Sequence, residues 1–261
     1  MILCIETSCD DTSAAIVAGR EVLSSVVSSQ NELHAQFGGV VPEVASRRHT
    51  ELMSAVVAEA MTMADVEWRD LTAVATTQGP GLIGALLVGM AAAKAYAYRC
   101  RLPLIPVNHL QGHIAANYAL GVKPPFLCLV ASGGHTLLAV VEEGVRYRVA
   151  ARTLDDAAGE AFDKGARLLG LGYPGGRELD RLAAQGDAGW VSFPRAVARR
   201  HDFSFSGLKT ALLYDLRGRE EAEVESRRAD IAASYQAAIV RQLVDKTVAV
   251  AAAEGLRSIA V

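Results

Sequence analysis

The chain contains little cysteine. Its 261 residues include only four (Cys4, Cys9, Cys100 and Cys128), and no two of them form a C-x-x-C pair. So few cysteines without paired spacing argue against a disulfide framework and favour reduced thiols. We therefore expect a cytoplasmic protein that is held together by a hydrophobic core, and 51% of the residues are hydrophobic.

Long apolar runs and an excess of positive charge are absent as well. The longest apolar stretch, residues 81–93, has thirteen residues, whereas a membrane-spanning helix needs ~20. No charged and then apolar leader opens the chain, so we expect no membrane association. The formal net charge is −3, which excludes a globally basic nucleic-acid binder. Any contact with nucleic acid must therefore depend on a local patch.

Two stretches of the sequence resemble each other. An apolar strand, a polar turn and a second strand open the chain, and the same pattern returns near its middle. Residues 126–129 (FLCL) match residues 2–5 (ILCI) type for type, at a constant offset of 124. This similarity predicts two related α/β halves.

Helix signals lie between these strands. We expect a helix from Pro42, because proline suits the first helical turn, and a long helix that ends at Gly255. Residues 157–169 predict a further helix with a solvated, salt-bridged face of Glu160, Asp163, Lys164 and Arg167. The chain then closes on an apolar strand, 256–261. Because a domain rarely ends on such a strand, we expect a C-terminally truncated chain.

Two histidines form the first candidate site. His109 and His113 are four residues apart in a predicted helix, so both rings lie on one face, as two ligands of one metal must. Metallopeptidases of the H-E-x-x-H type carry a glutamate base where this chain has Leu110. Catalytic metals usually have three protein ligands, so a third must come from elsewhere. A peptidase without its base, another metal site and a chance pair all stay open.

Three other motifs each allow two interpretations. Residues 131–136 (ASGGHT) predict a hairpin turn or a backbone that binds an anion. Residues 7–13 (TSCDDTS) predict a turn or the phosphate-binding hairpin of actin-like ATPases. Residues 195–209 predict a solvated loop or an RNA-facing patch of Arg195, Arg199, Arg200 and Lys209 around Phe203 and Phe205. Residues 78–84 (QGPGLIG) lack the G-K-[ST] of a phosphate loop, so their glycines favour a tight turn and close helix packing.

Taken together, these motifs occur in the order of one family. The segments are IETSCDDTSAAIV, GGVVPEVASRRH, GPGLIGALLVG, NHLQGHIAA, ASGGHT, DDAAGEAFDKGARLLGLGYPGG and FSFSGLKTA. The chain resembles the tRNA adenosine threonylcarbamoyltransferase family, TsaD, once described as O-sialoglycoprotein endopeptidases. This resemblance implies an α/β chain of two actin-like/RNase H-like (ASKHA) domains, with duplicated mixed sheets flanked by helices. We place the domains at 1–106 and 107–261, with the active site in the cleft between them.

The resemblance also implies a reaction. The family moves a threonylcarbamoyl group from threonylcarbamoyl-AMP to N6 of the adenosine 3′ of a tRNA anticodon (t6A synthesis). AMP is already a good leaving group, so no water-activating base is needed at Leu110. His109 and His113 correspond to ligands of one divalent ion, iron or zinc. The family supplies a third ligand, an aspartate, and a nucleotide loop beyond residue 261, which puts the activity of this exact chain in doubt.

Further site residues follow from the matched motifs. The resemblance implies adenylate contacts at Ala131, Ser132, Gly133, Gly134, His135, Asp163, Gly176 and Asp180. Asp10, Asp11 and His135 are the candidate catalytic proton acceptors, and the choice among them stays open.

The family also implies partners: tRNA, a shorter TsaB-like paralogue and a TsaE-like ATPase. Three rival functions are a zinc metallopeptidase, a non-catalytic TsaB-like scaffold and a sugar kinase of the same superfamily. The absent base at Leu110 argues against the first, and the histidine pair with SGGH argues against the second. The unusual first hairpin and the histidine pair argue against the third.

Overall fold

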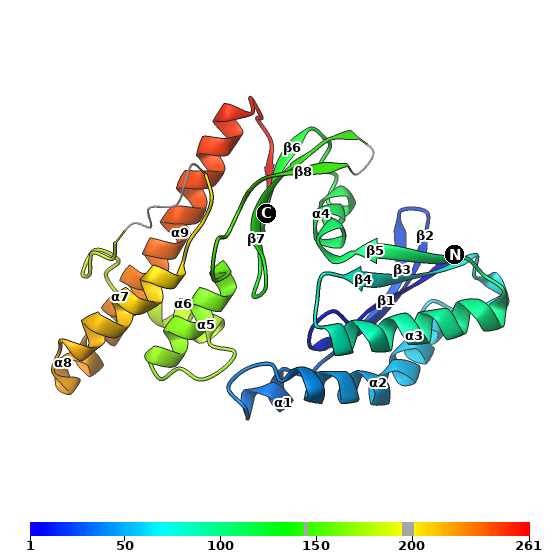
Figure 1. Cartoon of the computed structure of the whole chain (residues 1–261), viewed down its shortest axis with the longest axis horizontal. Helices are drawn as coiled ribbons and strands as arrows, with labels where there is room; N and C mark the ends of the chain where they lie inside the picture. The colour runs from blue at the N-terminus through cyan, green and yellow to red at the C-terminus, as the bar shows by residue number, and fades with distance from the viewer. Residues whose placement is uncertain (144–145, 195–200) are drawn as a thin grey trace. The chain divides into compact units, whose positions relative to one another are not determined.

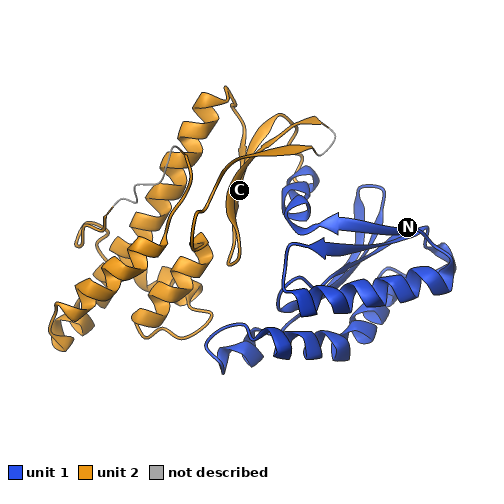
Figure 2. Ribbon diagram, in the orientation of Figure 1, with its two compact units in different colours: residues 1–119 blue, residues 120–261 orange. Residues whose placement is uncertain are grey.

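The chain folds into two compact α/β units. The computed structural model describes residues 1–143, 146–194 and 201–261. One unit comprises Met1–Ala119 and the other Leu120–Val261 (Figure 2). The division therefore falls after Ala119, whereas the sequence placed it after residue 106. The reason is that the helix carrying the two histidines packs against the sheet of the first unit.

The first unit is built on a mixed five-stranded sheet in the order β3-β2-β1-β4-β5 (Figure 1). The strands are β1 (Ile2–Glu6), β2 (Asp11–Ala18), β3 (Glu21–Ser29), β4 (Ala73–Gly79) and β5 (Leu104–Asn108). The first three form an antiparallel meander, whereas β1, β4 and β5 run parallel. The carboxyl ends of these three parallel strands consequently meet at one edge of the sheet.

Helices cover this sheet. Those that pack against it are α2 (Pro42–Met63), α3 (Ile83–Cys100) and α4 (His109–Ala119). The short helix α1 (Asn31–Ala35) lies between β3 and α2, and a 3₁₀ turn at Trp68–Asp70 precedes β4. As expected, α2 begins at Pro42, and it buries Met53, Val56 and Val57 in the core with Leu3 and Ile5. Helices α2 and α3 pack side by side (Figure 1).

The second unit repeats this arrangement in a sheet of order β8-β7-β6-β9. The strands are β6 (Phe126–Ala131), β7 (Thr136–Val141), β8 (Tyr147–Arg152) and β9 (Ile259–Ala260). Leu127 of β6 pairs in parallel with Ile259 of β9, as Leu3 of β1 pairs with Val74 of β4. Leu3 and Leu127 are 124 residues apart, so the structure confirms the repeat that the sequence predicted.

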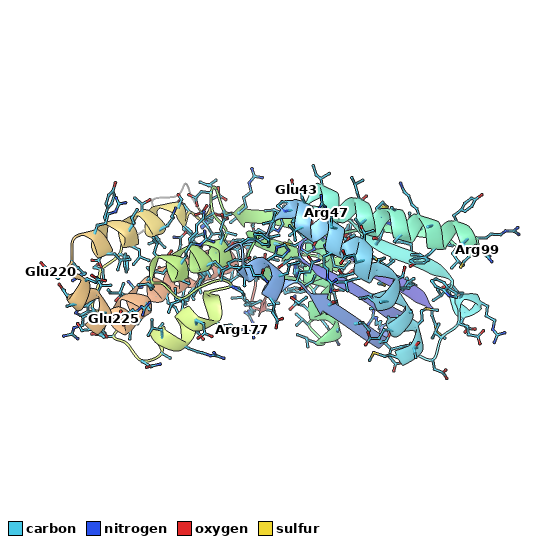
Figure 3. All side chains as sticks on the ribbon, turned by 90° about the horizontal axis from the view of Figure 1, so that it is seen from below. Glu43, Arg47, Arg99, Arg177, Glu220 and Glu225 are labelled. Atoms are coloured by element: carbon cyan, nitrogen blue, oxygen red, sulfur yellow. The ribbon has the colours of Figure 1, made fainter. Side chains whose placement is uncertain are left out.

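Five helices of the described residues belong to this unit. They are α5 (Ala158–Leu168), α6 (Gly176–Ala183), α7 (Ser206–Arg217), α8 (Glu221–Ser226) and α9 (Arg228–Ala253). The expected helix ending is confirmed: Gly255 has a φ of +66°, and the N–H of Leu256 donates to the carbonyl of Ala251 at 2.9 Å. Charged side chains such as Arg177 on α6 and Glu225 on α8 project from the surface (Figure 3).

None of the helices within the described ranges combines the length and the apolar character that crossing a membrane would require.

Close packing between α5 and α9 stabilises the core of the second unit. The Tyr235 side chain of α9 is fully buried, and its hydroxyl donates to the carbonyl of Ala161 at 2.9 Å. A Cβ on Gly165 would lie 2.2 Å from the Tyr235 ring. The ring therefore occupies the space that a side chain at Gly165 would need.

We predict that Gly165→Ala lowers the free energy of unfolding of the second unit by about 1–3 kcal/mol, because the buried ring must move. Urea unfolding followed by the fluorescence of Trp190, which lies in this unit, measures the change. Gly207→Ala is the matched control, since a Cβ there meets nothing within 4 Å, and its effect should stay within about 0.5 kcal/mol. Equal stability of the two variants would contradict the prediction.

Candidate functional site

The two histidines meet at the start of α4, directly after β5. The side-chain oxygen of Asn108 accepts hydrogen bonds from the N–H groups of Leu110 at 3.0 Å and Gln111 at 3.2 Å. Asn108 therefore caps α4 and fixes where the helix begins. His109 Nε2 lies 3.1 Å from His113 Nε2, with the rings edge to face at 81°. The expected one-turn spacing thus brings the two Nε2 atoms together.

This separation fits a shared metal ion. Two nitrogens that each lie ~2.1 Å from one ion are ~3.0 Å apart at a right angle and ~3.4 Å apart at the tetrahedral angle. The observed 3.1 Å falls in that interval. Within the three described ranges, no group of three or more His, Cys, Asp or Glu side chains is placed to hold a metal. The structure therefore brings these two nitrogens together, and their role as metal ligands stays a prediction.

A carboxylate that the sequence did not single out lies behind His109. Glu6 ends β1, and its Oε2 lies 3.3 Å from His109 Nδ1. Thr77 at the end of β4 donates its hydroxyl to the same carboxylate, and so does the Ser8 N–H. Burial alone would raise the pKa of Glu6, but the hydrogen bonds with His109, Thr77 and Ser8 lower it to about 2. The sequence feature that could have pointed to Glu6 is an acidic residue at the end of a buried strand.

Close contacts hold the loop after β1. The Ser8 carbonyl accepts from the N–H of Leu82 at 2.8 Å, and a Cβ on Gly81 would lie 2.5 Å from the same oxygen. This confirms that the glycines of 78–84 serve close packing. The buried His49 of α2 also bonds to the Thr12 hydroxyl at 2.7 Å and to the Cys9 carbonyl at 3.0 Å.

Asp10 and Asp11, two of the candidate proton acceptors, lie on this tethered turn. Asp10 is half-buried and Asp11 is exposed at the start of β2. Both therefore belong to the first unit, as His109 and His113 do, whereas the third candidate, His135, belongs to the second.

The turn at 131–136 is the hairpin between β6 and β7, which confirms one of its two interpretations. The N–H of Ser132 donates to the His135 carbonyl at 2.8 Å, and the N–H of His135 donates to the Ser132 hydroxyl at 3.0 Å. Neither Gly133 nor Gly134 has a positive φ, and a Cβ on either would meet nothing within 4 Å. No neighbouring atom therefore crowds the backbone at the two glycines.

The other predicted adenylate contacts gather around α5 and α6. Asp163 Oδ1 accepts from the N–H groups of Gly175 at 3.0 Å and Gly176 at 3.1 Å. Asp180, one turn into α6, accepts from Gln236 of α9 at 2.8 Å. Asp163 therefore binds the loop before α6 and does not join the salt-bridged face expected for this helix. That face contains Lys164, with Asp156 at 2.7 Å and Glu160 at 2.9 Å.

The basic stretch at 195–209 needs a correction. Phe203 and Phe205 are fully buried, with their rings stacked 6.0 Å apart, so they belong to the core and not to a nucleic-acid-binding surface. The two-residue spacing of Phe203 and Phe205 is the sequence feature that indicates a shared buried face. Lys209 is half-buried on α7. Arg195, Arg199 and Arg200 lie outside the described residues.

Asp155 organises this segment, a role that no motif of the sequence indicated. Its Oδ1 accepts from the N–H groups of Phe205 at 2.7 Å and Ser206 at 3.2 Å. Its Oδ2 accepts from the hydroxyls of Ser204 at 2.6 Å and Ser206 at 2.9 Å. Partial burial would raise the pKa of Asp155, but these bonds lower it below 3.8. Asp155 thus caps α7 from a residue distant in sequence.

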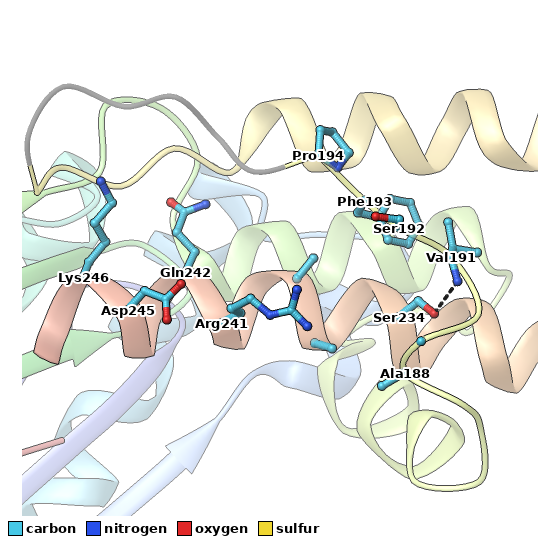
Figure 4. A pocket seen from close by; sticks show the side chains of 13 residues that line it. Ala188, Val191, Ser192, Phe193, Pro194, Ser234, Arg241, Gln242, Asp245 and Lys246 are labelled. Atoms are coloured by element: carbon cyan, nitrogen blue, oxygen red, sulfur yellow. Dashed lines mark hydrogen bonds between the residues drawn. The ribbon is translucent and has the colours of Figure 1, made fainter. Parts of the chain in front are cut away.

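A pocket of about 310 Å³ lies elsewhere in the second unit, between α9 and residues 188–194 (Figure 4). Arg241, Asp245 and Lys246 line one side, and Val191 and Phe193 line the other. None of the predicted site residues is among its lining side chains, so we assign it no role in the reaction.

The chain matches the family model described as tRNA N6-adenosine threonylcarbamoyltransferase over residues 21–261. The enzyme of that name from Clostridium perfringens is 52% identical over 253 residues, which are 95% of this chain and 75% of that protein. The Clostridium kluyveri enzyme of the same name is 49% identical over 266 residues, covering 100% of this chain and 78% of the relative. The chain belongs to this family. Its relatives are named as acyltransferases that modify tRNA.

Solved structures support the fold. Component A of (R)-2-hydroxyglutaryl-CoA dehydratase from Acidaminococcus fermentans matches 98% of this chain and 79% of its own, with a TM-score of 0.52 and 13% identity. The ROK hexokinase from Thermus thermophilus matches 99% of this chain and 92% of its own, with a TM-score of 0.50 and 16% identity. The expected ASKHA fold is thereby confirmed. The roles of the site residues stay predictions.

We predict that Asp155→Ala lowers the free energy of unfolding by about 1–2 kcal/mol at neutral pH, because α7 loses its cap. The pKa of Asp155 is lower in the folded state, so its contribution is present above 3.8 and is lost as the pH falls through the folded value. The stability difference between wild type and variant should therefore be constant from about pH 7 to about pH 5 and should shrink as the pH is lowered to about 3. Urea unfolding across this range measures it, and a constant difference would contradict the assignment.

Proposed function

We propose that this chain transfers the threonylcarbamoyl group from threonylcarbamoyl-AMP to N6 of the adenosine 3′ of the anticodon in tRNAs that read codons beginning with A. The amine nitrogen forms a bond to the carbamoyl carbon, the bond from that carbon to the AMP phosphate breaks, and AMP leaves. Membership of the family supports the reaction class. The structural observation that supports a specific site is the close approach of the Nε2 atoms of His109 and His113.

One divalent ion, iron or zinc, is the proposed cofactor. His109 and His113 would hold it through Nε2, and a ligand from outside the described residues would complete the site. When bound, such an ion supplies Lewis-acid polarisation of the threonylcarbamoyl group. Leu110 is compatible with this role because the reaction needs no activated water.

The turn at 131–135 is the proposed cradle for the adenylate. The N–H groups of Ser132 and His135 are occupied within the turn. Those of Gly133 and Gly134 have no partner in the described part of the chain, so they are the donors we assign to the phosphate or carbonyl oxygen. Asp163, Gly176 and Asp180 are proposed as further adenylate contacts.

The proton lost from N6 passes to Asp10, Asp11 or His135 in this proposal. The weakly nucleophilic amine depends mainly on positioning, which a tethered loop such as 7–10 supports. Asp10 lies on that loop and Asp11 follows it at the start of β2, and the loop is anchored by bonds to Leu82 and His49.

We also propose three macromolecular partners: tRNA, a TsaB-like paralogue and a TsaE-like ATPase. A stripe of exposed apolar residues on α3 supports a protein partner, because Ile83, Leu87 and Tyr98 are 78%, 63% and 88% exposed on one helix face. This stripe is the surface that we assign to the paralogue.

The first test concerns metal. His109→Ala and His113→Ala should each sharply lower the occupancy of Zn²⁺ or Fe²⁺, since only one of the two imidazoles remains. Elemental analysis after reconstitution measures occupancy, and t6A formation on unmodified tRNA, with both partner proteins present, measures transfer. Gln111→Ala, in the same helix turn, is the control and should retain metal. Unchanged occupancy in His109→Ala would refute the site, and hydrolysis of a glycoprotein by the loaded wild type would favour a peptidase.

The second test concerns tRNA. We propose that the stretch with Arg195, Arg199, Arg200 and Lys209 contacts tRNA phosphates. Lys209→Glu should weaken tRNA binding and lower the slope of log Kd against log salt by about one unit. Arg217→Glu, an exposed position at the other end of α7, is the matched control. Identical salt dependence in wild type and both variants would place the tRNA surface elsewhere.

A further inference from the structure

Glu6 joins four segments of the first unit at a single carboxylate. It ends β1, accepts from the Ser8 N–H of the following loop, accepts from the Thr77 hydroxyl near the end of β4, and contacts His109 at the start of α4. A hydroxyl, a backbone N–H and an imidazole from separate segments therefore converge on one side chain. Such convergence holds the carboxylate in one position.

The contact with Glu6 determines the direction of the His109 ring. An ionised carboxylate can only accept hydrogen bonds, so contact at 3.3 Å favours the tautomer of His109 with its proton on Nδ1. The lone pair of Nε2 then points away from Glu6. That nitrogen is the one that lies 3.1 Å from His113 Nε2. The ring is therefore held by the sheet through Nδ1, and its Nε2 is directed toward His113.

We infer that Glu6 is the positioning residue of the metal site: it holds His109 in the Nδ1–H tautomer and in the orientation that directs Nε2 toward a shared ion. The inference rests on the proposed metal site. Glu6 is not a third ligand here, because it contacts the ring nitrogen opposite to Nε2. Carboxylates that orient metal-binding histidines in this way typically change metal affinity 10–100-fold when removed.

The same carboxylate links the metal ligand to the loop with the candidate proton acceptors. Through the Ser8 N–H, Glu6 fixes the start of the segment that continues to Asp10 and Asp11. The Ser8 hydroxyl also lies 3.2 Å from His109 Nδ1. A hydroxyl can accept from Nδ1–H or donate to a bare Nδ1. The ionised carboxylate can only accept and is the stronger partner, so the pair with Glu6 favours the proton on Nδ1. A change at Glu6 should therefore alter both the histidine ring and this loop.

The experiment measures tautomer and metal affinity separately. In the metal-free protein, long-range ¹H–¹⁵N NMR of the histidine rings reports which nitrogen of His109 carries the proton, with His109→Ala providing the assignment. We expect Nδ1–H in the wild type and a shift toward Nε2–H in Glu6→Ala. Calorimetry with Zn²⁺ alone should show an affinity loss of about 10–100-fold in Glu6→Ala and a smaller loss in Glu6→Gln, which retains one acceptor oxygen.

Thr7→Val is the matched control for general disturbance of this loop. Thr7 follows Glu6 in the chain, is buried, and donates its hydroxyl to the Ala85 carbonyl of α3 at 2.9 Å. Its removal should lower stability but leave the His109 tautomer and Zn²⁺ affinity as in wild type. Equal losses of affinity in Thr7→Val and Glu6→Ala would overturn the specific role of Glu6.

Two further outcomes distinguish this inference from the proposed function. If His109→Ala binds Zn²⁺ as tightly as wild type, the metal site itself fails. If His109 is required but Glu6→Ala binds equally well, only the positioning role fails. Should the Glu6 variants not fold, the wild-type spectrum still decides, because a proton on Nε2 of His109 in the metal-free protein overturns the inference.

Discussion

Parallel pairing of β1 with β4, and of β4 with β5, is the constraint on which the site in the first unit depends. Three strands that run in one direction deliver their carboxyl ends to one edge of the sheet. Glu6, Thr77 and Asn108 occupy those ends, so residues 71 to 103 positions apart in the sequence become neighbours. The His109 ring is placed by the same geometry, because α4 starts where β5 stops.

The second unit has the same strand pairing but lacks the carboxylate. The hairpins β1–β2 and β6–β7 have the same register: Ile5 pairs with Ala14, and Leu129, which is 124 residues later than Ile5, pairs with Leu138. At the same offset Val130 stands where Glu6 stands, while Ser132 matches Ser8. The repeated backbone therefore carries a carboxylate at this position only in the first copy. The second copy offers the open glycine turn instead.

Close backbone approach is the other condition that both units meet. In the first unit, Gly81 lets the Ser8 carbonyl reach the start of α3. In the second unit, Gly159 lets α5 approach the 131–136 turn, because a Cβ on Gly159 would lie 2.7 Å from the Ser132 carbonyl. Both turns that carry predicted site residues are thus packed against the beginning of a helix. This packing limits how far either turn can move without disturbing the core.

Local chemistry by itself determined much of this protein. The helix at Pro42, the ending at Gly255 and the one-turn spacing of His109 and His113 follow from short-range rules of backbone geometry and periodicity. The internal repeat follows from direct comparison of two stretches of sequence. Tertiary structure alone decided that Glu6 lies behind His109, that Asp155 caps α7, that Phe203 and Phe205 face the core, and that α4 belongs to the first unit. Each of these depends on segments far apart in the chain, and a single sequence contains no measure of which distant residues will meet.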